Sequence, residues 1–240
     1  MAQEDVTTDT RAWAGLWLSE ERLAPYLAVC GGDADRAVEL HEWNISLGQV
    51  LMRDIAHLEV AVRNAYDRTL SAAWGERWLL DNGSPVRRPL MRRAAKGELD
   101  LNRINRKTID STADNLPEGF TKGQLVAGLT LGFWVHLADR SREVAVWRTG
   151  LYRAWPRGTR RADLLRSLDG VLRVRNRVAH DERLFNPRRP ELSPLDADAD
   201  ATHLFRVLCP EAAERVLGIG TMTPVEEFLA LNPAPAEVQL

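Results

Sequence analysis

Three side chains close together in the sequence, Arg175, Asn176 and His180, are of the types that phosphodiester chemistry uses. An RNA phosphodiester is cleaved without a metal ion when the 2′-OH attacks the adjacent phosphorus atom. That reaction needs a group that moves a proton, which histidine does near neutral pH. It also needs a cation that stabilises the growing charge on phosphorus, which arginine does through two donors at once. The trio, with Asn176 to orient the phosphate or the histidine, therefore predicts a catalytic motif.

The spacing within this motif sets a geometric condition. Residues five apart on an ideal α-helix point about 140° apart, because each residue turns by roughly 100°. Arg175 and His180 therefore converge only if the helix ends or bends before His180, or if a second protomer completes the site. Arg173, Arg177 and His180 lie on one helical face, so Arg173 is the alternative catalytic arginine. The non-catalytic alternative is an exposed histidine favoured by the dipole at a helix C-terminus.

Charge is distributed unevenly along the chain. The net charge is only −2, yet residues 140–189 contain fourteen arginines against five acidic residues, a balance of +9. Arginine suits phosphate oxygens and stacks on bases, so one interpretation is a surface that faces RNA. The other is a preference for arginine codons, with solvated faces paired to acids. Residues 191–240 are acidic overall.

The elements that must position the motif are expected to be helical. Ser19 is a candidate N-cap for a helix over residues 20–29, and Asp33 for a long helix that reaches about Trp74. Gly48 is a candidate point at which this helix bends or splits. Apolar residues in the long helix recur every three or four positions and predict one buried stripe, namely Leu47, Leu51, Ile55, Leu58, Val62 and Ala65.

Further helices are expected along the rest of the chain, and alternating runs typical of strands are not found. Gly128 and Gly132 have the spacing that lets another helix approach closely. A loop is expected after Pro187, through Pro190, Pro194, Asp196, Asp198 and Asp200. The expected helical ranges are two between Pro85 and Asn115, then 121–138, 143–154, Thr159 to His180, 201–217 and a short one after Pro224.

Composition excludes several classes of protein. With 240 residues and 45% hydrophobic content the chain can build a core. No apolar run approaches the roughly 18 residues of a membrane span, and the first twenty residues lack the features of a secretory signal. We therefore expect a cytoplasmic protein without membrane partners or cofactors. The cysteines and the other histidines fit no metal-ligand spacing and are expected to be structural: Cys30, Cys209, His41, His57, His136 and His203. Four tryptophans in helical apolar patterns are expected in the core: Trp43, Trp134, Trp147 and Trp155.

The segment Leu172–Glu182 resembles the signature of HEPN domains: an arginine, four to six residues and a histidine, with a polar residue after the arginine. Two other segments are similar, in the same order, to those of the Abi-like (abortive infection) branch. One is residues 58–64, and the other is residues 132–134 followed by Trp147 and Trp155-Pro156. Together the three cover about residues 20–190. One departure is Asp181, which stands where many relatives place a second histidine.

The resemblance implies an all-α, HEPN-like helical bundle with additional helices. It implies an N-terminal extension at residues 1–18, an Abi-like HEPN domain at 19–190 and a peripheral C-terminal helical segment at 191–240. It also implies a homodimer with the two Arg/His motifs near the interface. The implied activity is that of a metal-independent endoribonuclease, often a bacterial toxin or antiphage effector, for which an antitoxin is a candidate partner.

The resemblance assigns catalytic roles to Arg175 and His180 and a supporting role to Asn176. Glu59 becomes an accessory group, together with Arg63 and Asn64, although an exposed ion pair between Glu59 and Arg63 is an alternative. Cleavage by 2′-OH attack would leave a 2′,3′-cyclic phosphate. Two other functions are considered: a non-catalytic helical module that binds RNA or a partner, and a structural or regulatory member of a defence or toxin–antitoxin system.

Overall fold

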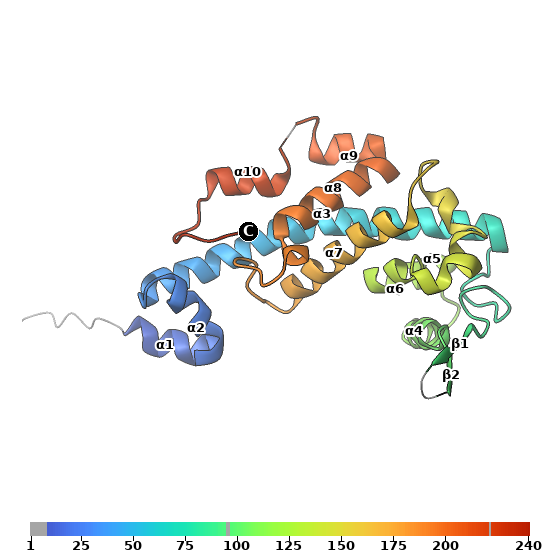
Figure 1. Cartoon of the computed structure of the whole chain (residues 1–240), viewed down its shortest axis with the longest axis horizontal. Helices are drawn as coiled ribbons and strands as arrows, with labels where there is room; N and C mark the ends of the chain where they lie inside the picture. Colours follow the sequence, from blue (N-terminus) through green and yellow to red (C-terminus); the bar gives the residue numbers. More distant parts are fainter. Residues whose placement is uncertain (1–8, 95–96, 221) are drawn as a thin grey trace, which may run out of the picture.

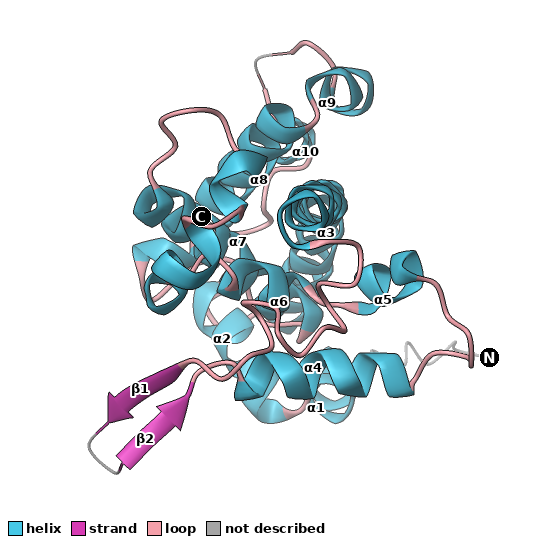
Figure 2. Cartoon of the chain, turned by 90° about the vertical axis from the view of Figure 1, so that its right-hand side faces the viewer, coloured by secondary structure: helices cyan, strands magenta, loops and turns pink. Residues whose placement is uncertain are grey.

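The computed structural model describes residues 9–94, 97–220 and 222–240, and most of these residues are helical (Figure 1). The predicted all-α class is confirmed. Strands were not expected, but a short antiparallel hairpin is present, formed by β1 (Met91–Ala94) and β2 (Gly97–Asp100). Figure 2 shows the hairpin projecting from the helical body. None of the described helices is both long and apolar enough to cross a membrane.

The central element is α3 (Ala34–Trp74), which confirms the long helix predicted from Asp33 to Trp74. The Asp33 side chain accepts a hydrogen bond from the backbone N–H of Arg36, and the helix ends at Gly75, whose φ of 89° favours glycine. Gly48 does not split α3, which is one uninterrupted helix. A Cβ at this position would lie 3.2 Å from Cγ1 of Val178, so the glycine gives room for a neighbouring helix.

Two shorter helices, α1 (Thr10–Leu18) and α2 (Glu20–Val29), pack against the N-terminal end of α3 (Figure 1). The predicted helix over residues 20–29 is confirmed. As expected, Ser19 caps it, with its side-chain oxygen accepting from the N–H of Arg22 at 3.4 Å. This part of the fold places α2 beside one end of the central helix.

Along the rest of α3 lie α7 (Arg161–Ala179) and α8 (Pro194–Leu208), with α5 (Lys122–Gly128) and α6 (Leu131–His136) nearby. Seen end-on in Figure 2, α3 has α7 and α8 on one side and α5 on the other. The helix predicted to follow Thr159 is present but begins at Arg161.

The single helix predicted over residues 121–138 is wrong. The backbone of Leu129 is extended, which separates α5 from α6. Gly128 and Gly132 therefore belong to different helices. A Cβ on Gly128 would lie 2.7 Å from Cγ2 of Thr112, so only this glycine is needed for a close approach; the nearest atoms to Gly132 are at ordinary contact distance.

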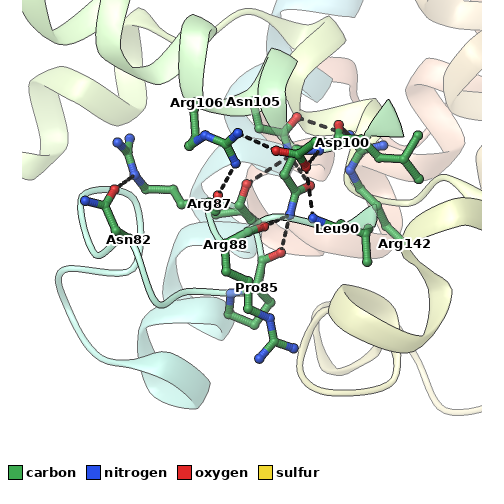
Figure 3. A network of polar contacts seen from close by, with 12 residues as sticks. Asn82, Pro85, Arg87, Arg88, Leu90, Asp100, Asn105, Arg106 and Arg142 are labelled. Atoms are coloured by element: carbon green, nitrogen blue, oxygen red, sulfur yellow. Dashed lines mark hydrogen bonds and ion pairs between the residues drawn. The ribbon is translucent and has the colours of Figure 1, made fainter. Parts of the chain in front are cut away.

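The prediction of two helices between Pro85 and Asn115 is partly wrong. The hairpin takes the place of the first, and among the described residues of this range the one helix is α4 (Arg103–Asp114). A polar network fixes this region (Figure 3). Asp100 accepts hydrogen bonds from the N–H groups of Leu90 (2.9 Å) and Asn102 (3.0 Å) and forms an ion pair with Arg106. These contacts tie the two ends of the hairpin together and to α4.

The predicted helix over residues 143–154 is replaced by short irregular turns. They are a 3-10 turn at Arg140–Arg142, a π-helical turn at Glu143–Trp147 and a second 3-10 turn at Leu151–Ala154. Between the last two, Gly150 has a Cβ position only 3.1 Å from Cβ of Ala73 and 3.3 Å from Leu70. The tight packing of this turn on α3 accounts for the break.

The loop predicted after Pro187 is wrong from Pro194 onward, because Pro194 is the first residue of α8. The Ser193 side chain caps that helix by accepting from the N–H of Asp196 at 3.2 Å. The helix predicted over residues 201–217 is divided at Cys209 into α8 and α9 (Pro210–Leu217). The short helix expected after Pro224 is confirmed as α10 (Pro224–Leu231).

Candidate functional site

A pocket of about 760 Å³ lies where the C-terminal end of α7 meets α2 and the beginning of α3. Four side chains of α7 and its C-cap line it: Arg173, Asn176, Arg177 and His180. Their spacing of three, four and seven residues places them on one helical face. Arg175 does not line the pocket, and its Nη1 lies 3.4 Å from Oδ1 of Asn176. The structure thus brings His180 together with Asn176 and with the alternative arginine, Arg173.

The helix ends immediately before His180, which is one of the alternative conditions for convergence with Arg175, yet Arg175 is not in the pocket lining. α7 stops at Ala179, and Asp181 follows the C-cap with a left-handed φ of 51°. The N–H of Asp181 donates to the carbonyl of Val178 (3.0 Å) and that of Glu182 to the carbonyl of Arg177 (2.9 Å). This pair of bonds is the Schellman arrangement that closes many helices. It leaves His180 exposed beyond the last helical residue.

The imidazole of His180 has no hydrogen bond to the described part of the chain, whereas its backbone carbonyl accepts from Nη2 of Arg22 at 3.5 Å. The ring is therefore not committed to a structural contact. It is accessible to a ligand in the pocket, which is what proton transfer to or from a substrate requires.

The loop that follows His180 is held by α3. Asn44, only 2% exposed, accepts from the N–H of Leu184 at 2.7 Å and donates to the carbonyl of Glu182 at 3.4 Å. Arg177 donates to the carbonyl of Arg183 and forms an ion pair with Glu182 at 3.3 Å. Arg177 thus has a structural role in shaping the loop.

Charge in the pocket is predominantly positive, with five arginines and three acidic residues in the lining. Arg173 is paired with Asp169 outside the lining, at 2.7 Å. No ion pair within the described part of the chain involves the three arginines from α2 and the loop, namely Arg22, Arg183 and Arg188. Guanidinium groups that are not paired with a carboxylate can bind the phosphate oxygens of a ligand.

Two residues of the pocket lining, Tyr26 and His41, were not identified from the sequence as part of a site. Tyr26 on α2 is buried, and this burial raises its pKa to about 12, so the hydroxyl stays protonated. Its ring lies edge-on to His41 (5.4 Å between centroids) and to Phe185 (5.3 Å). His41, expected to be structural, is indeed buried but also lines the pocket. Only tertiary packing brings these residues to His180, so their spacing gave no signal.

The accessory residues predicted on α3 do not line the pocket. His41 of α3 lines the pocket, and Glu59 lies about 27 Å further along an ideal helix. Arg63 donates instead to the carbonyl of Ala127 at 3.4 Å, and no ion pair to Glu59 occurs among the residues described. Asn64 is exposed. Within one chain, Glu59, Arg63 and Asn64 are thus separate from the pocket.

The other candidate positions are mostly structural. Trp43, Trp134, Trp147 and Trp155 are buried, as predicted. Cys30 and Cys209 are free thiols. In the ranges that the structure describes, no group of three or more His, Cys, Asp or Glu side chains is placed to hold a metal ion.

Comparison of the chain with protein-family models, curated proteins and solved structures finds no match. The relation to HEPN domains therefore stays a prediction, carried by the motifs of the sequence itself, and the function is argued from the pocket.

Proposed function

We propose that this chain is a metal-independent endoribonuclease of the HEPN type, which cleaves RNA and acts as a bacterial antiphage or toxin effector. The observation that carries the proposal is the imidazole of His180, exposed in a positively charged pocket and lying on the same helical face as Arg173 and Asn176. This combination offers a proton-transfer group, a cation and an amide to a phosphodiester.

In the proposed reaction, the 2′ oxygen of a ribose attacks the adjacent phosphorus atom. The bond from O2′ to phosphorus forms, the bond from phosphorus to O5′ breaks, and a proton passes from the 2′-OH to the leaving oxygen. His180 is the group that moves this proton. The products are a 2′,3′-cyclic phosphate and a 5′-OH end.

Arg173 is the arginine that we assign to the developing charge on phosphorus, because it lines the pocket two turns before His180. Arg22, Arg183 and Arg188 are suited to the flanking phosphates. Arg175 and Glu59 lie outside the pocket of one chain, so they would contribute only through a second protomer. A homodimer is therefore part of the proposal only if Arg175 proves essential. An antitoxin, if the chain has one, would act by covering the pocket.

The experiment uses the purified full chain with structured and unstructured RNAs in EDTA, beside the variants His180→Ala and His136→Ala. His136 is a matched control: it is exposed and paired with Asp139 at 3.2 Å, outside the pocket. We expect the native chain and His136→Ala to produce cyclic-phosphate ends and His180→Ala to produce none. Equal cleavage by the native chain and His180→Ala would overturn the assignment of His180.

A second candidate function is a helical RNA-binding module without catalysis, favoured by Arg22, Arg183 and Arg188, which have no carboxylate partner among the described residues. It predicts RNA binding of equal strength by the native chain and His180→Ala, with no cleavage by either. The same experiment, with a binding measurement added, therefore decides between the two.

A further inference from the structure

We propose that Trp13 and Trp17, on the exposed face of α1, form a base-stacking platform beside the pocket and select RNA whose bases are unpaired. This inference deepens the proposed function and rests on it for the identity of the ligand. The platform lies outside the Arg/His motif and adds a determinant of substrate choice to the site.

The first observation is the geometry and exposure of the two rings. Their centroids are 6.3 Å apart with an angle of 24° between planes, so they are nearly parallel. Trp13 is 39% exposed and Trp17 is 55% exposed, and Leu16 between them is 89% exposed. Two exposed, nearly parallel indole rings offer flat apolar faces on which the base of a ligand can stack.

The second observation is that Trp17 contacts a residue of the pocket lining. The ring of Trp17 lies edge-on to His41 at 5.1 Å, and His41 lies edge-on to Tyr26 at 5.4 Å. Both His41 and Tyr26 line the pocket that contains His180. A nucleotide chain with its phosphate at His180 would thus have its neighbouring bases beside the indole rings.

The charges of the pocket indicate which ligand fits the platform. Stacking on an indole is available to any base, because every base has a π-face, while the backbone needs cations nearby. Arg22, Arg183 and Arg188 supply those cations in the pocket lining. In a double helix the bases are stacked on each other and cannot reach the indoles, so single strands, loops and bulges are the substrates that fit.

The test measures binding separately from cleavage. Labelled oligonucleotides of one sequence, single-stranded and as a duplex, are titrated with the full chain carrying His180→Ala, which prevents turnover. We expect tighter binding of the single strand than of the duplex. We expect Trp13→Ala with Trp17→Ala to weaken single-strand binding by roughly 10-fold or more, because stacking on each base contributes about 5- to 150-fold.

Leu16→Ala is the matched control, since it removes apolar surface from the same face without removing a ring. It should leave single-strand binding unchanged, and Trp17→Phe, which keeps a ring, should retain most of it. Circular dichroism checks that each variant is folded. Single-strand binding that is unchanged in the double tryptophan variant would overturn the platform.

A second copy of the chain is the competing occupant of this face. Sedimentation velocity of the same variants tests it: dissociation of a dimer by Leu16→Ala and by the tryptophan variants alike, with RNA binding retained, would replace the platform with a protein interface. The outcomes for the two proposals differ. If His180→Ala loses cleavage but the tryptophan variants bind single strands as tightly as the chain with both tryptophans, only the platform is overturned. Tryptophan-dependent binding without any cleavage overturns only the nuclease.

Discussion

Arg173 and His180 lie two helical turns apart on the face of α7 that lines the pocket, whereas Arg175 lies outside the lining. An arginine can stabilise a phosphorane only if its donors reach the phosphate that His180 serves. In a single chain Arg173 lines the same pocket as His180, and Arg175 does not. The ion pair of Arg173 with Asp169 holds its side chain without burying it, since both are about half exposed.

The first prediction separates the two arginines by mutation. Arg173→Ala should lower the cleavage rate by about 10²–10³-fold, the loss expected when one donor to a developing oxyanion is removed. Arg175→Ala should change the rate by only a few-fold. Rates under single-turnover conditions give the comparison, with Asp169→Asn testing whether the ion pair matters. The reverse order of effects would mean that a second protomer brings Arg175 into the site.

The second prediction concerns the anchor of the loop after His180. Asn44→Ala leaves the buried N–H of Leu184 without its acceptor, so it should lower the free energy of unfolding by about 1–3 kcal/mol. Ser46→Ala is the control on the same helix, because within the described ranges its hydroxyl donates only to the carbonyl of Glu42, one turn earlier. Urea unfolding measures both variants. Equal stability of the two would show that the Asn44 contact contributes little.

The third prediction follows from the left-handed backbone of Asp181. A non-glycine residue at a φ of 51° is strained, and a carboxylate at a helix C-terminus opposes the helix dipole. Asp181→Gly should therefore raise the free energy of unfolding by about 1 kcal/mol. Because Asp181 also lines the pocket, its replacement should tighten the binding of RNA. Thermal unfolding and an RNA titration measure the two effects, and Asp181→Val, which cannot adopt this φ easily, should be destabilised.

Caps and helical faces could be predicted from the sequence because they depend on near neighbours. Ser19 and Asp33 are found as N-caps where they were expected. The shared face of Arg173, Arg177 and His180 also follows from spacing alone. Each of these features needs only the geometry of one helix.

The rest of the site depends on contacts between distant segments. Arg22 and Tyr26 share the pocket with His180 because α2 and α7 both pack against α3. The start of α8 did have a local signal, a serine followed by proline at the first helical position, but the neighbouring prolines and acids suggested a loop. Asp198 was therefore expected in a loop and is instead buried in a helix, because α8 packs along α3.

The fourth prediction rests on the carboxyl groups of Asp54 in α3 and Asp198 in α8. Each residue is only 1% exposed, and neither oxygen of Asp54 has a hydrogen-bond donor from the described part of the chain. Burial, followed by the charge of Asp198, raises the pKa of Asp54 to about 7. Burial likewise raises the pKa of Asp198, whose Oδ1 has no hydrogen-bond partner among the described residues. Two buried carboxyl groups can share one core only if at least one of them keeps its proton, because two negative charges there would repel each other.

The consequence is a dependence of stability on pH with a definite sign. An unfolded aspartate releases its proton near pH 4, so between about pH 4 and about pH 7 the folded chain holds a proton that the unfolded chain has lost. Stability contributed by this pair is therefore present at low pH and is lost as pH rises to about 7. Asp54→Asn, which cannot ionise, should raise the melting temperature relative to the native chain at about pH 8 and change it little at about pH 4. Melting temperatures of both proteins across this range measure the difference, which should grow with pH. A difference that does not change with pH would show that Asp54 has the same pKa in the folded and unfolded chains, which would contradict the retained proton.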